Sequence, residues 1–374
     1  MQLGLLVWLA LLMVPGAMSR VEAVGFGPPA LRDGHYPPLA LYPEQVRAVR
    51  ALASPPSVTA ASALMFDLDS MQALFAKEPD RPLPPASTVK VMTALVVLRR
   101  SSQDERVTVS EAAASAPGSL VGLTSGETLT VRDLLFGLLL PSGNDAAVAL
   151  AEHVAGSEEA FVDLMNQTSA ELGLTRSHFS NVHGLDSPEQ LVTASDMVTI
   201  TKAALTYPDF AQIVSTASAQ VAGRTLSNTN ELLSTYPQAD GVKTGTTDNA
   251  GECLIASVTR DGHRLLVVVL GSKNRYADAS ALLDYAASTW EWRRLSLPED
   301  ALAWEAGNDG RLHRLSSPDP RSVFLARWQW PMAQTVRVLD PTVPFTGTLP
   351  VGELRLVLPD RIVASVPLTV LHGP

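Results

Sequence analysis

The sequence has a single cysteine, Cys253, and therefore cannot form an internal disulfide. Cys253 is also too far from the N-terminus to be the acylated cysteine of a lipoprotein, and we expect a small buried strand residue. The seven histidines are scattered, and none belongs to an HExxH motif or a similar cluster of metal ligands. We therefore expect no metal and no cofactor.

An excess of basic residues is also lacking. Lys and Arg number 28 against 38 Asp and Glu, and the formal net charge is −10. A protein that binds nucleic acid needs a basic face, so nucleic acid is excluded as a partner. The 374 residues, 46% of them hydrophobic and 18% charged, are typical of a globular protein long enough for two domains.

No hydrophobic run is long enough to span a bilayer comfortably. The run at residues 3–14 is followed by small residues up to Ala23, which is typical of a secretory signal peptide. We expect a signal peptide at 1–23, cut after Ala23 or Ser19, and an extracytoplasmic location. Met1 and Gln2 carry no positive charge, so an uncleaved amphipathic or buried helix stays open as an alternative.

Strand patterns lie at both ends of the next region, with helical patterns between them. A Pro-rich lead occupies 24–56, and a domain follows at 57–295. We expect strands at 61–66, 73–76, 252–259 and 264–270. We expect helices at 87–98, 131–140, 145–154, 158–172, 193–204 and 278–292. This order predicts an antiparallel sheet covered by helices, an α/β protein of the α+β type.

Short alternating segments and recurring prolines mark the remainder of the chain. Strands are expected at 323–328, 335–338, 354–358 and 362–370. We therefore expect a small all-β C-terminal domain at 296–374.

Ser87 and Lys90 are a candidate nucleophile and general base. Three residues apart on a helix, they share one face. A serine hydroxyl is a weak nucleophile until a base takes its proton, and lysine is a base only when it is neutral. Burial and the charge of Lys243 would both favour the neutral amine. Alternatively, Ser87 and Lys90 could lie at the exposed start of a helix and have no catalytic role.

Ser142-Gly143-Asn144 lies in a loop that enters the next helix. The Ser142 hydroxyl can relay a proton to a leaving amine, and Asn144 can hold Lys90 and bind a substrate amide. Read alone, Ser142 could equally be a helix N-cap.

Lys243-Thr244-Gly245 precedes a stretch with the pattern of an edge strand. Lys243 and Thr244 offer a cation and a hydroxyl to a terminal carboxylate, and Gly245 would let a substrate backbone approach. The N–H groups of Ser87 and Thr246 are a natural oxyanion hole. A solvated lysine at a turn is the alternative.

The three motifs, in this order and with matching flanks, resemble the serine D-alanyl-D-alanine carboxypeptidases, the low-molecular-mass penicillin-binding proteins. The resemblance covers roughly 57–292. The matching segments are 85–95, 139–147, 152–156, 240–247, 250–251 and 253–254.

This resemblance implies a penicillin-binding protein/β-lactamase-like transpeptidase fold. It further implies removal of the terminal D-Ala from peptidoglycan stem peptides ending in D-Ala-D-Ala, through an acyl-enzyme on Ser87. β-Lactam antibiotics would acylate the same serine. The best-known members end in an amphipathic helix on the membrane, whereas 358–374 is predicted to be strand and tail, which leaves membrane contact undecided.

Three other functions stay open. A DD-endopeptidase would cut peptidoglycan crosslinks with the same residues. A serine β-lactamase is disfavoured, because no Glu-based deacylation loop is found. A non-catalytic peptidoglycan-binding scaffold would keep the site without the chemistry. His183-Gly184-Leu185 is interpreted as a structural turn, and the Trp290/Trp292 and Trp328/Trp330 pairs as packing residues rather than a sugar platform.

Overall fold

The computed structural model describes residues 54–297, 303–307, 310–345 and 349–371. The expected signal peptide and nearly all of the Pro-rich lead lie outside these residues. Contacts divide the chain into two units, one of Pro55–Ala286 and one that contains Ala287–Pro374. Each unit is described by itself, and the domain boundaries drawn from the sequence stay predictions.

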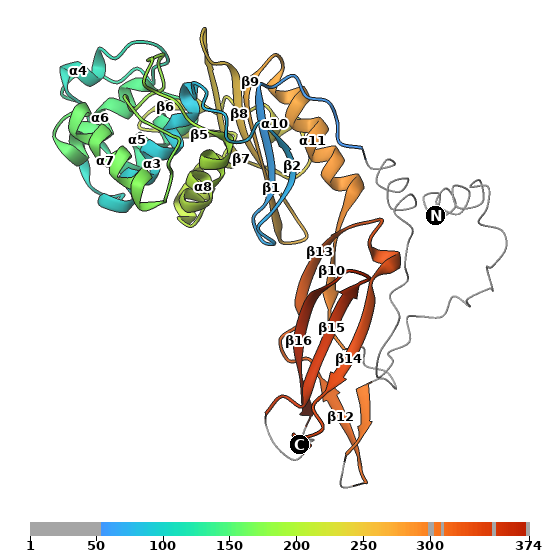
Figure 1. Cartoon of the computed structure of the whole chain (residues 1–374). Helices are drawn as coiled ribbons and strands as arrows, with labels where there is room; N and C mark the ends of the chain where they lie inside the picture. Colours follow the sequence, from blue (N-terminus) through green and yellow to red (C-terminus); the bar gives the residue numbers. More distant parts are fainter. Residues whose placement is uncertain (1–53, 298–302, 308–309, 346–348, 372–374) are drawn as a thin grey trace, which may run out of the picture. The chain divides into compact units, whose positions relative to one another are not determined.

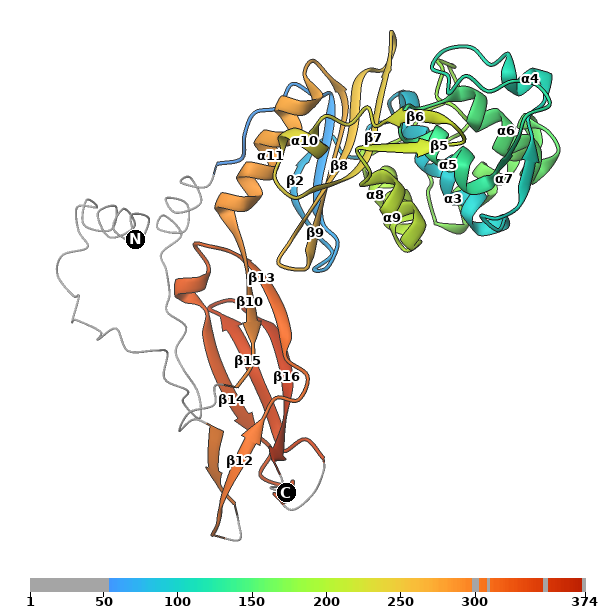
Figure 2. The same ribbon diagram turned by 180° about the vertical axis from the view of Figure 1, so that it is seen from behind.

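The Pro55–Ala286 unit is built on a five-stranded antiparallel sheet with the order β2-β1-β9-β8-β7. Figures 1 and 2 show helix α8 on one face of this sheet and helix α11 on the other. The central strands β8 and β9 are buried over most of their length, and β7 forms one edge. The strands are β1 (Ser62–Asp67), β2 (Gln72–Lys77), β7 (Ala239–Thr247), β8 (Gly251–Arg260) and β9 (His263–Ser272).

The helices of this unit gather mainly between β2 and β7 in the sequence. Thr130 begins α5 with a reciprocal capping box, in which it and Asp133 satisfy each other's backbone N–H. The longer helices are α3 (Lys90–Arg100), α5 (Val131–Leu139), α6 (Asn144–Ala155), α7 (Glu158–Glu171), α8 (Ala194–Leu205), α9 (Pro208–Val214) and α11 (Arg275–Thr289). Short elements are α4 (Glu111–Ala114), α10 (Leu232–Thr235), β3 (Arg106–Thr108), β4 (Thr128–Thr130), β5 (Ser218–Val221) and β6 (Arg224–Ser227).

Two expected helices were wrong at one end. The helix predicted from Ser87 is a 3₁₀ turn, η2 (Ala86–Val89), and α3 begins only at Lys90. Ala86, the first residue of this turn, has a positive φ of 48°, so the chain does not enter it in the α-helical conformation. The helix predicted to reach Trp292 ends at Thr289, because Trp290–Leu295 pairs as strand β10 with β13.

The second unit contains the last residues of α11, and its described part beyond Thr289 is mainly β, with the 3₁₀ turn η4 (Trp330–Met332) between β13 and β14. One sheet has the order β11-β12-β16-β15-β14, and β10 pairs with β13. Alternate residues of β16, from Ala364 to Val370, enter its core. The strands are β10 (Trp290–Leu295), β11 (Trp304–Ala306), β12 (Leu312–Ser316), β13 (Arg321–Ala326), β14 (Gln334–Leu339), β15 (Gly352–Leu358) and β16 (Arg361–Leu371).

The tryptophans at 290, 292 and 330 take part in packing. Trp290 and Trp292 both stack on Phe324, with ring centroids 5.3 and 4.7 Å away. The Arg293 guanidinium lies 4.6 Å from the Trp330 ring centroid. The expected fold class, a helix-covered antiparallel sheet followed by a β-rich C-terminal region, is confirmed.

The first prediction concerns the core of the second unit. Leu354 is fully buried, so Leu354→Ala should lower its free energy of unfolding by about 2–5 kcal/mol. Five of the six tryptophans lie at 290–330, so their emission during urea unfolding reports on this unit. Leu349→Ala is the matched control, because Leu349 is 68% exposed and its truncation should change little. If Leu354→Ala and Leu349→Ala lowered the free energy of unfolding equally, Leu354 would not belong to a core of the second unit.

Candidate active site

Lys90 is fully buried at the first turn of α3, and its amine contacts three oxygens. Lys90 Nζ lies 2.9 Å from Ser87 Oγ, which η2 places on the same face three residues earlier. It also donates to Asn144 Oδ1 and to the carbonyl oxygen of His183, both at 2.7 Å. Segments of the chain around 87, 144 and 183 therefore meet at one nitrogen.

The electrostatic environment favours the neutral amine at Lys90. Burial is the largest cause that holds the pKa of Lys90 well below its usual range, and the charge of Lys243 lowers that pKa further. The carboxylate of Asp145 acts in the opposite direction. Lys90 thus has the character that a general base requires.

In the second motif, hydrogen bonds hold the Asn144 side chain, whereas the Ser142 hydroxyl has no partner within the described residues. Asn144 Nδ2 donates to the carbonyl oxygen of Pro117 at 2.6 Å, which turns Oδ1 toward Lys90. Ser142 is buried with a positive φ of 68°, and its Oγ has no hydrogen-bond partner within the described residues. Gly143 is the N-cap of α6, so the alternative interpretation of Ser142 as an N-cap is wrong.

The third motif lies within the edge strand β7, whereas the sequence pattern placed it before a strand. Lys243 is buried, and its Nζ donates to the carbonyl oxygen of Thr244 at 3.1 Å. Burial, and next the charge of Arg275, lower the pKa of Lys243 to about 7. Thr244 Oγ1 lies 2.6 Å from Thr229 Oγ1, and Thr246 is exposed.

Two glycines let the protein's own backbone pack tightly around Ser87. A Cβ on Gly245 would lie 2.8 Å from Ser87 N and 3.0 Å from Thr88 N. Gly245 therefore makes room for η2, in addition to any substrate that lies along β7. A Cβ on Gly184 would lie 2.1 Å from the carbonyl oxygen of Ala86, so this position tolerates only glycine.

Arg275 is a candidate functional residue that the motifs do not reveal. At the start of α11, its guanidinium donates to the carbonyl oxygen of Gly245 at 2.8 Å and to Thr246 Oγ1. It also forms an ion pair with Glu252. Arg275 therefore brings a cation to the end of β7. No spacing rule links it to Lys243, because α11 and β7 meet only in the folded chain.

His183 contributes through its backbone as well as its ring. Its carbonyl oxygen accepts from Lys90, a contact that no side-chain motif could predict. Burial, followed by the charge of Lys90, lowers the pKa of the His183 imidazole to about 4, so the ring is neutral at pH 7. Cys253 is buried in β8 as expected.

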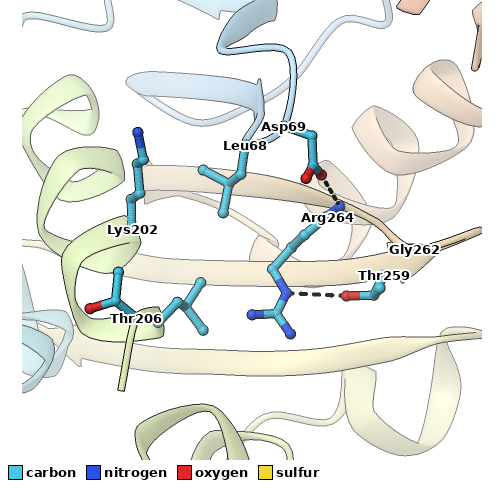
Figure 3. A pocket seen from close by; sticks show the side chains of 8 residues that line it. Leu68, Asp69, Lys202, Thr206, Thr259, Gly262 and Arg264 are labelled. Atoms are coloured by element: carbon cyan, nitrogen blue, oxygen red, sulfur yellow. Dashed lines mark hydrogen bonds between the residues drawn. The ribbon is translucent and has the colours of Figure 1, made fainter. Parts of the chain in front are cut away.

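A separate cavity lies where the β1–β2 and β8–β9 turns meet the end of α8 (Figure 3). It has a volume of about 290 Å³, and none of the expected site residues lines it. Its arginine, Arg264, already donates to Thr259 Oγ1 and forms an ion pair with Asp240. In the part of the chain that the structure describes, no group of three or more His, Cys, Asp or Glu side chains could hold a metal ion.

Comparisons with known proteins identify the family of the chain. The family model described as "D-alanyl-D-alanine carboxypeptidase" matches residues 49–274. The chain is 38% identical to the D-alanyl-D-alanine carboxypeptidase DacF of Bacillus subtilis over 62% of its own length and 63% of that relative's. It is 33% identical to DacD of Salmonella typhimurium, over 87% of this chain and 89% of that relative.

Solved structures extend the similarity beyond the family match. Penicillin binding protein 6B from Escherichia coli superposes with a TM-score of 0.68 at 32% identity, over 85% of this chain and 97% of that chain. The DacD structure from Francisella tularensis gives a TM-score of 0.66 at 26% identity, over 86% and 95%. With the family model matching more than half of its residues, the chain belongs to the D-alanyl-D-alanine carboxypeptidase family.

Proposed function

We propose that this protein is a serine-type carboxypeptidase that removes the terminal D-alanine from peptidoglycan pentapeptide stems. The observation that carries the proposal is the buried Lys90 amine 2.9 Å from Ser87 Oγ. A neutral amine has two N–H groups and one lone pair. Because Asn144 and His183 each present a carbonyl oxygen at 2.7 Å, they can take both N–H groups and leave the lone pair for Ser87.

Acylation then follows as one proton transfer and one displacement. Lys90 takes the proton from Ser87 while Oγ bonds to the carbonyl carbon between the two D-alanines. The N–H groups of Ser87 and Thr246 would stabilise the oxyanion, and the close approach at Gly245 brings their two backbone segments together. The C–N bond breaks, and the proton that Lys90 took from Ser87 passes through the Ser142 hydroxyl to the leaving D-alanine amine, which returns Lys90 to its neutral form. Water hydrolyses the resulting ester and releases the shortened stem.

The substrate's terminal carboxylate would bind at the end of β7. Thr244 and Thr246 supply hydroxyl groups, while Lys243 and Arg275 supply positive charge. As an edge strand, β7 can also pair with an extended peptide through main-chain hydrogen bonds. Asn144 would bind a substrate amide.

The same site would accept β-lactam antibiotics as acylating substrates. Their strained amide would occupy the position of the D-Ala-D-Ala bond, so Ser87 would carry the penicilloyl group. We also propose that the protein acts outside the cytoplasm, where peptidoglycan stems are exposed. Among the described residues, no helix is both long and apolar enough to cross a membrane.

The central test follows the mass of a pentapeptide muropeptide incubated with the protein. We expect loss of one D-alanine, and complete loss of this activity in Ser87→Ala, because among the described residues Ser87 supplies the hydroxyl that the Lys90 amine contacts. Lys90→Met should slow acylation about 10²–10⁴-fold, the range for removal of a general base. Fluorescent penicillin and mass spectrometry of the protein would locate the acyl group on Ser87.

The products distinguish the three remaining functions. Cleavage of crosslinked dimers without release of D-alanine would identify a DD-endopeptidase. Binding of muropeptides without any product would identify a scaffold. Turnover of penicillin far faster than of the peptide would identify a β-lactamase.

The pH dependence of acylation tests the electrostatic role of Lys243. Lys90 reacts only when neutral, so the acylation rate should fall as the pH drops through its pKa. Lys243→Met removes the positive charge that helps to lower this pKa, and the acid limb should therefore move to higher pH. Lys202→Met, an exposed lysine on α8, is the control and should leave the limb unchanged. An unchanged limb in Lys243→Met would contradict this role.

A further inference from the structure

The loop at residues 117–123, here called the 117–123 loop, determines how Asn144 is oriented. The Asn144 side-chain Nδ2 donates to the carbonyl oxygen of Pro117 at 2.6 Å, and its backbone N–H donates to Ser119 at 2.7 Å. Once Nδ2 is engaged by Pro117, Oδ1 is the atom that faces Lys90. A rotated or displaced amide would place an N–H donor against the lysine amine, which would compete for its lone pair.

Asp145 holds this loop from the inside. It follows Asn144 in the first turn of α6 and is 1% exposed. Its carboxylate accepts hydrogen bonds from the backbone N–H groups of Val121, Gly122 and Leu123, at 2.9–3.1 Å. It accepts a further one from Ala146 at 2.9 Å. Three successive N–H groups converging on one carboxylate form a nest, an arrangement that favours an anion.

Two glycines allow the loop to come this close. A Cβ on Gly118 would lie 2.7 Å from Asn144 Nδ2. A Cβ on Gly143 would lie 2.5 Å from Val121 Cγ2 and 2.7 Å from Asp145 Oδ1. The loop, Asn144 and Asp145 therefore pack as one tight assembly next to the Lys90 amine.

Arg224 of β6 holds the loop from the outside. Its guanidinium forms a bidentate pair with Glu127, with distances of 2.7 and 2.8 Å. The same Nη2 donates to the carbonyl oxygen of Gly122 at 2.9 Å. This contact meets the loop at one of the residues whose N–H binds Asp145.

We propose that Asp145 is a positioning residue for acylation, which fixes the 117–123 loop and through it the direction of the Asn144 amide. Asp145 touches neither Ser87 nor Lys90 by a hydrogen bond in the structure and acts through its neighbour. Arg224 supports the same loop from the opposite side with a smaller effect. The inference rests on the proposed function, in which Lys90 is the base and Ser87 the nucleophile.

The test compares the rates at which fluorescent penicillin acylates Ser87 in two matched variants. Asp145→Asn replaces an anion by an amide that cannot accept from all of these N–H groups, and acylation should slow about 100-fold. Asp133→Asn is the control, because it alters a first-turn carboxylate of α5 that binds only its own cap residue Thr130. We expect the control to lower the melting temperature while leaving the acylation rate within about threefold of native.

A double-mutant cycle separates positioning from general loss of stability. If Asp145 acts through Asn144, the effect of Asp145→Asn should largely disappear in the Asn144→Ala background. The pH profile is a second readout. The charged and titratable groups that face Lys90 are Lys243, Asp145 and the neutral His183 ring. The Asp145 charge raises the pKa of Lys90 directly, so Asp145→Asn should move the acid limb to lower pH with or without Asn144. The loss of acylation rate at high pH, where Lys90 is neutral, is the part that should depend on Asn144.

Arg224→Gln keeps the inference testable if Asp145→Asn fails to fold. It loosens the loop at Gly122 and should slow acylation about tenfold, again only when Asn144 is present. The inference is overturned if the folded Asp145→Asn protein acylates within about threefold of native. It is equally overturned if the effects of Asp145→Asn, or of Arg224→Gln in its place, add fully to that of Asn144→Ala. A native protein that is not acylated at all would instead overturn the proposed function.

Discussion

A lysine amine with no exposed surface, enclosed by carbonyl oxygens and faced by a second lysine, is the constraint around which this site is built. A charged ammonium there would lose its hydration and would face the charge of Lys243. The neutral amine satisfies the same geometry at lower cost, because Asn144 and His183 accept both of its protons. Burial, charge and hydrogen bonding therefore all select the form of Lys90 that can act as a base.

Backbone groups carry much of this arrangement. The carbonyl oxygens of His183 and Pro117 orient Lys90 and Asn144, and the N–H groups of 121–123 hold Asp145. Such contacts need a close approach of chain segments that are far apart in sequence. Gly184 and Gly245 allow it, since a Cβ at either position would overlap η2. The surroundings of the reactive pair are therefore rigid, which suits a reaction that depends on the direction of a lone pair.

The two units differ in architecture, and the candidate active site belongs to the Pro55–Ala286 unit. In the Pro55–Ala286 unit, the sheet presents β7 at an edge while the helices between β2 and β7 supply Ser87, Lys90 and Asn144. The other unit has its own core of alternating apolar residues and stacked aromatic rings. Apolar and polar residues alternate regularly in the sequences of β13, β14, β15 and β16, so these four strands could be predicted directly. Strands β10, β11 and β12 could not be predicted: β10 continues a helical pattern, and β11 and β12 are short.

The fold class, most of the longer helices, half of the strands and the three motifs could be predicted from the amino-acid sequence, because hydrophobic periodicity and short-range spacing are local properties. The strands that were not predicted include β7, which carries Lys243. The sequence also indicated the family, since both the motifs and their flanks match. The folded chain was needed to show that Ser87 lies on a 3₁₀ turn and that the backbone of η2 packs closely against Gly245. The same holds for Arg275, Asp145 and the His183 carbonyl beside the motifs. These features depend on contacts between segments as far apart in the sequence as Ser87 and Gly245. Backbone carbonyl groups are common to all residues, so their contacts cannot be predicted from residue identity.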